Sequence, residues 1–105
     1  MKLLITTQVY ENYGAHDWDG VGECPQYWKA KGGNDYVVNK FKGGSEKATL
    51  AVMALRSQIE ENSVYFRESI INWTIVSDNY LTFFEKSQLE YDGRILYSPK
   101  ELSWV

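Results

Sequence analysis

The chain has few of the residues that build covalent or metal-held frameworks. Its 105 residues include one cysteine, Cys24, one histidine, His16, and only two prolines. A single cysteine excludes an internal disulfide, so we expect a protein of a reducing cytoplasm. The apolar N-terminal stretch turns polar at Thr6, too early for a signal peptide. No apolar run approaches the roughly 20 residues that span a bilayer, so we expect no membrane association.

Aromatic side chains are what the sequence has in excess. Tyr, Trp and Phe make up 15% of residues and hydrophobic residues 44%, enough for a packed core, so we expect one ordered domain over residues 1–105. The net charge is −3, and basic residues are concentrated in residues 29–47, which contain five lysines and two acidic residues. An acidic chain of this kind is not a general nucleic-acid binder.

Hydrophobic periodicity predicts an α+β fold with the element order β-β-β-α-β-α-β. We expect one mostly antiparallel sheet, with one long and one short helix packed on it. The predicted strands cover 3–10, 26–31, 36–41, 69–76 and 94–97, and the second and third of these form a hairpin around Gly32–Asp35.

The two helices are predicted from their caps and apolar stripes. The long helix runs from Ser45 to about Glu61 and the short one from Phe83 to about Glu90, after a capping box that joins Thr82 to Glu85. The inward stripe of the long helix is Ala48, Val52, Leu55 and Ile59, widened by Leu50, Ala51 and Met53. In the strand at 69–76, Ile71, Trp73 and Ile75 are expected on one face.

The segment 11–25 is the most unusual part of the chain, because ordered loops of this length are often functional. It carries aromatic and acidic side chains, and such aromatic residues anchor many protein interfaces. We therefore predict a partner-binding surface made by Tyr13, His16, Asp17, Trp18, Asp19, Glu23 and Tyr27. Its partner would be a host protein or protein complex. The sequence also leaves a homodimer open.

Two chemical alternatives use the same loop. A metal-dependent hydrolase would employ Glu11, His16, Asp17 and Asp19, but the spacing fits neither a calcium loop nor a zinc site, so we predict no metal and no cofactor. Nucleophilic catalysis by Cys24 with His16 is disfavoured, because both lie on a glycine-rich loop and Pro25 follows the cysteine. We therefore expect no catalytic residues.

A second candidate surface interleaves lysines with aromatic rings, an arrangement that neutralises phosphates and stacks bases. It is equally typical of an edge hairpin whose aromatic rings lie in the core and whose lysines face water. As an alternative function, we consider sequestration of a small anionic ligand or nucleotide by Trp28, Lys29, Lys31, Tyr36 and Lys40.

Residues 8–20, continuing through 23–33, resemble small accessory proteins of tailed bacteriophages and prophages. The resemblance covers about a quarter of the chain and carries no catalytic residues. It implies a protein of the infected bacterial cytosol that inhibits or modulates a host protein, such as a host defence complex. The leading hypothesis is thus a non-enzymatic protein that acts by steric occlusion.

Overall fold

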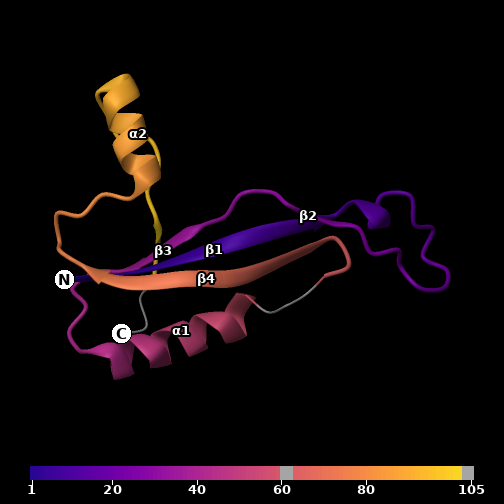
Figure 1. The fold of residues 1–105 in the computed structure, drawn as a ribbon, viewed down its shortest axis with the longest axis horizontal. Helices are drawn as coiled ribbons and strands as arrows, with labels where there is room; N and C mark the ends of the chain where they lie inside the picture. The colour runs from indigo at the N-terminus through magenta and orange to yellow at the C-terminus, as the bar shows by residue number, and fades with distance from the viewer. Residues whose placement is uncertain (60–62, 103–105) are drawn as a thin grey trace.

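The protein is built in three layers, with a sheet between two helices (Figure 1). The structure is a computed structural model that describes residues 1–59 and 63–102. Helix α1 (Ser45–Ile59) lies along one face of the sheet, and α2 (Phe83–Asp92) stands on the opposite face. The prediction of an α+β fold is therefore confirmed. Among the described residues, no helix is long and apolar enough to cross a membrane.

The first strand is the axis of the sheet. β1 (Lys2–Asn12) pairs antiparallel with β4 (Phe66–Val76) along almost its whole length. On its other side it pairs with two short strands, β3 (Asp35–Val38) near its start and β2 (Trp28–Ala30) at its end. This central position agrees with the two largely apolar or β-branched faces of the predicted strand at 3–10.

The two short strands do not pair with each other, so the predicted hairpin is wrong. Both pair with β1, one after the other along the same side. The residues between them also bond to β1, because the N–H of Val9 donates to the carbonyl of Gly32 and the N–H of Thr7 to that of Asn34. In a hairpin the two strands pair with each other. Residues 28–38 instead run alongside β1 and form hydrogen bonds with it at both ends and in between.

The last strand lies at a different place in the chain from the prediction. β5 (Lys100–Glu101) pairs parallel with β3, which makes the sheet mixed. The strand expected at 94–97 is absent there. Its backbone is bonded elsewhere, because the side-chain oxygen of Gln88 accepts the N–H groups of Leu96, at 2.6 Å, and of Tyr97.

The hydrophobic core lies between α1 and the sheet. Its fully buried members include Leu3 and Ile5 of β1 and Leu55 of α1. The predicted stripe of α1 is largely confirmed, since Ala48, Ala51, Val52 and Leu55 are buried and Ile59 packs against them. Leu50 and Met53 instead remain 65% and 55% exposed, because they lie on the far side of the helix. Residues 60–61 of the predicted helix lie outside the described residues.

A bulge changes which face of β4 meets the core. Thr6 pairs with Asn72 and Thr7 with Ile70, so Ile71 is an extra residue without a partner on β1. Ile70 therefore shares the core side with Trp73 and Ile75, while Ile71 is exposed. The expected grouping of Ile71 with Trp73 and Ile75 is wrong for this reason.

Helix α2 has the predicted start but packs less than predicted. The capping box is present, with Thr82 Oγ1 accepting from Glu85 N at 3.2 Å and Glu85 Oε1 from Thr82 N at 3.1 Å. Beyond this first turn the helix extends away from the sheet (Figure 1). Phe83 and Tyr91 are 77% and 91% exposed, so α2 contributes little to the core.

Candidate functional site

The candidate site is the loop between β1 and β2, called here the distal loop and comprising residues 13–27. It leaves the sheet at the carboxyl end of β1 and extends beyond the other elements (Figure 1). It begins with a short 3-10 turn at Tyr13–Ala15. The glycines Gly20 and Gly22 adopt positive φ angles of 86° and 74°, which the reversal of the chain at the loop tip requires.

One buried amide fixes the base of the distal loop. Asn12 is fully buried, and its Oδ1 accepts the N–H groups of Gly14 at 3.0 Å and Tyr27 at 2.8 Å. Its Nδ2 donates to the carbonyls of Pro25 at 2.9 Å and Val64 at 3.0 Å. These four bonds join both ends of the loop to each other and to the segment that precedes β4. The loop therefore leaves the sheet in a defined direction.

Beside this anchor, an ion cluster occupies the start of the loop. Glu11 is largely buried, and its two carboxylate oxygens contact Lys31 Nζ at 2.6 Å and His16 Nε2 at 3.2 Å. The hydrogen bond from Lys31 lowers the pKa of Glu11, and the same bond raises the pKa of Lys31. These contacts connect the end of β1 to the distal loop through His16 and to the residue after β2 through Lys31, so the cluster stabilises the base of the loop.

Two tyrosine rings of the loop contact the same lysine side chain. Lys29 Nζ lies 5.4 Å from the ring centre of Tyr13 and 5.1 Å from that of Tyr27, within the range of a cation–π interaction. The ring of Tyr13 also contacts His16, with centroids 5.2 Å apart. Tyr13 and Tyr27 both remain exposed on this support. They present a pre-ordered aromatic surface at the base of the loop.

The outer part of the loop is acidic. Asp17, Asp19 and Glu23 are exposed, and within the described part of the chain no basic group approaches them within 4.0 Å. Asp19 Oδ1 accepts the N–H of Val21 at 3.0 Å, and Trp18 Nε1 donates to the carbonyl of Val21 at 3.3 Å. Trp18 is half-buried, so the most exposed apolar side chain of the tip is Val21.

The structure does not bring the five residues of the lysine–aromatic surface together. Trp28 is covered by the guanidinium of Arg67, whose central carbon lies 4.1 Å from the ring centre. Tyr36 is buried in the core, whereas Lys40 follows β3 near the opposite end of β1. Lys29 already contacts Tyr13 and Tyr27 of the distal loop, and Lys31 contacts Glu11 of β1, so this set forms no common anion site.

A polar cluster that sequence reasoning missed lies at the edge of the core. The carboxylate of Glu68 accepts hydrogen bonds from Thr7 Oγ1, from Asn34 Nδ2 at 2.9 Å and from Tyr36 Oη at 3.0 Å. Burial alone would raise the pKa of Glu68, but these three bonds and the charge of Lys100 together lower it. The three hydrogen-bond partners come from two segments far from Glu68 in the sequence, β1 and residues 34–36, so no local sequence pattern predicts the cluster.

The Glu68 cluster connects separate segments of the sheet. Burial and the neighbouring Glu68 carboxylate raise the pKa of Tyr36 well above its ordinary value. Near neutral pH the tyrosine therefore keeps its proton while Glu68 stays ionised, so the hydrogen bond from Tyr36 to the carboxylate is maintained. Through the bonds of Glu68 to Thr7 and Asn34, the cluster links β4 to β1 and to the segment before β3.

Metal-ligating side chains do not converge on the distal loop. Across residues 1–59 and 63–102, no group of three or more His, Cys, Asp and Glu side chains could hold a metal ion. Of the four residues considered for a hydrolase, His16 contacts Glu11, while Asp17 and Asp19 face solvent. Searches against protein-family models, curated proteins and solved structures found no match.

Proposed function

We propose that this chain is a non-enzymatic binding protein that engages a host protein through the distal loop and blocks it sterically. The observation that carries the proposal is the contrast between base and tip. Asn12 and the Glu11 cluster make the base rigid, while Asp17 and Glu23 at the tip keep charges that pair with no described residue. A loop ordered before binding loses less entropy when it meets a partner.

The negative charge of the loop tip indicates which kind of partner surface it can bind. Asp17, Asp19 and Glu23 complement a basic patch, and such complementarity mainly accelerates association and selects the partner. Tyr13 and Tyr27 supply apolar contact area beside these charges, in the manner of interface anchors. The resemblance of residues 8–20 and 23–33 to phage accessory proteins supports a host protein as the target.

The test is affinity capture from a bacterial lysate with three forms of the tagged protein, read by quantitative mass spectrometry. The double variant Asp17→Asn/Glu23→Gln removes two loop charges and leaves the Asp19–Val21 turn intact. The matched control Glu46→Gln/Glu90→Gln changes the net charge equally at exposed helix positions. We expect a host protein that the wild type and the control enrich and the loop variant loses.

The same comparison can contradict the proposal. If the loop variant and the control retain the captured protein equally, the distal loop is not the contact surface. If raising the salt concentration leaves capture by the wild type unchanged, the acidic tip makes no electrostatic contribution to recognition.

A further inference from the structure

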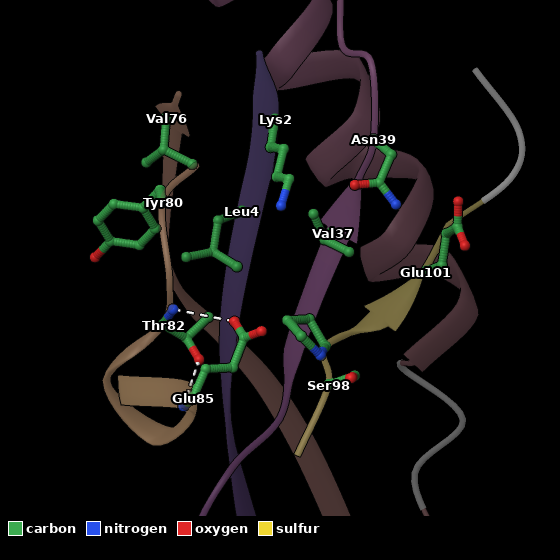
Figure 2. Close-up of a pocket in the computed structure, with 11 residues that line it drawn as sticks. Lys2, Leu4, Val37, Asn39, Val76, Tyr80, Thr82, Glu85, Ser98 and Glu101 are labelled. Carbon is green, nitrogen blue, oxygen red and sulfur yellow. Dashed lines mark hydrogen bonds between the residues drawn. The ribbon is translucent and has the colours of Figure 1, made fainter. Parts of the chain in front are cut away.

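A second concave site lies far from the distal loop. A cavity of about 210 Å³, open to solvent on one side, lies between the sheet face opposite α1 and the segments before and after α2. Its floor consists of Leu4, Val37 and Val76, and Tyr80 contributes to its wall (Figure 2). Pro99 also lines the cavity. Because it lies near the amino end of β1, this cavity is separate from the surface proposed above.

Charged groups of opposite sign face the cavity without pairing. In Figure 2 the ammonium group of Lys2 and the carboxylate of Glu85 lie on opposite sides of the apolar floor, with Leu4 and Val37 between them. Glu101 lies at the outer rim. Within the described part of the chain, none of these three groups has an opposite charge within 4.0 Å. The gap between Lys2 and Glu85 is therefore available to a ligand.

The carboxylate of Glu85 is held in place by the helix cap. Its Oε1 accepts the N–H of Thr82 at 3.1 Å, and Thr82 itself is buried. This leaves the rest of the carboxylate free to receive another donor. A group oriented in advance loses little rotamer freedom when a ligand binds.

We propose that this cavity binds a small zwitterion, an amino acid whose carboxylate contacts Lys2 and whose ammonium group contacts Glu85. Its carbon chain lies on Leu4 and Val37. A ligand with a single charge leaves one protein charge partly desolvated and without a partner, which is unfavourable. The cavity of about 210 Å³ has room for one small molecule of the size of an amino acid.

The first experiment compares ligands by NMR titration of the whole protein. L-Leucine and 5-aminopentanoate carry both charges, on one carbon or at the two ends of a chain, and pentanoate and pentylamine each carry one. We expect one zwitterion to bind with a dissociation constant on the order of 1 mM or below, at least about tenfold tighter than both single-charge compounds. The amides of Leu4 and Val37 should shift.

Two variants test the assigned contacts. Glu85→Gln removes the charge but keeps the capping box, which accepts Gln at this position, and Lys2→Gln removes the opposite charge. Each should weaken binding of the zwitterion at least about tenfold, whereas Glu90→Gln and Lys42→Gln, at exposed positions outside the cavity, should not.

Three results would overturn the assignment. The first is no binding of either zwitterion at about 20 mM, and the second is equal binding of a single-charge compound. The third is unchanged binding of the zwitterion by folded Glu85→Gln and Lys2→Gln proteins.

Discussion

Replacing Asn12 with alanine tests whether one buried side chain holds the distal loop to the sheet. The substitution removes two accepted and two donated hydrogen bonds at once. It leaves the N–H of Tyr27 and the carbonyl of Val64 without their side-chain partner. The partners of Asn12 lie in three segments, at Gly14, at residues 25–27 and at Val64. The substitution therefore affects both ends of the loop and the residues before β4 together.

The size of the effect follows from the number and burial of these bonds. A typical intramolecular hydrogen bond contributes about 1 kcal/mol, and a buried polar group left unpaired costs about 1–3 kcal/mol. Water entering the vacated space restores part of this, and bonds that share one side chain are not additive. We expect the free energy of unfolding to fall by about 3 kcal/mol, a large part of the stability of a small domain.

The measurement is urea unfolding of the Asn12→Ala protein beside Asn39→Ala, which truncates an exposed asparagine. Hydrogen exchange in the folded state should also show faster exchange at the amides of Gly14 and Tyr27. A loss of stability equal to that of Asn39→Ala, with unchanged exchange at these two amides, would refute the role assigned to Asn12.

Three further predictions concern the core, the polar cluster and the path of the chain beside β1. Leu55→Ala should lower the free energy of unfolding by about 2–5 kcal/mol in thermal or urea unfolding, whereas Leu50→Ala, on the exposed side of α1, should change it by less than about 0.5 kcal/mol. The pKa of Glu68 is lowered from 4.5 in the folded state, so its stabilising contribution is present above pH 4.5 and is lost as pH falls through the lower folded value. Glu68→Gln should remove that part of the acid dependence, and an identical pH profile in both proteins would contradict the prediction. Gly33→Ala should destabilise the fold, because its added Cβ overlaps a backbone carbonyl of β1, while Gly44→Ala, which has open space around it, should be tolerated in the same unfolding assay.

Local patterns in the sequence predicted the elements whose own residues carry the signal. The strand at 3–10 has apolar or β-branched residues on both faces, and the long helix has a repeat of apolar side chains that matches one face. The start of α2 follows from the spacing of Thr82 and Glu85, which forms a hydrogen-bonded cap within four residues. These features depend on bonds and packing periods inside one segment, so the sequence is sufficient to find them.

Pairing partners could not be found in this way. The turn residues between 31 and 36 are compatible with a hairpin, yet β2 and β3 each pair with β1 instead. The bulge at Ile71 likewise depends on the register between β1 and β4 and on no motif in β4 itself. Strand pairing is decided by which hydrophobic faces the whole chain can bury together, and this is a nonlocal property.

For the candidate sites too, some features could be predicted from the sequence and others depend on the tertiary structure. Composition and loop length alone pointed to residues 11–25 as an acidic and aromatic segment. Only the tertiary structure decided that Asn12 anchors this loop, that the lysine–aromatic residues lie apart, and that Lys2 and Glu85 face one cavity. Sequence specifies which chemical groups are present and their local periodicity. The hydrogen bonds of Asn12 to Tyr27 and Val64 and the cavity between Lys2 and Glu85 join groups that are far apart in the chain, so they exist only once the sheet has formed.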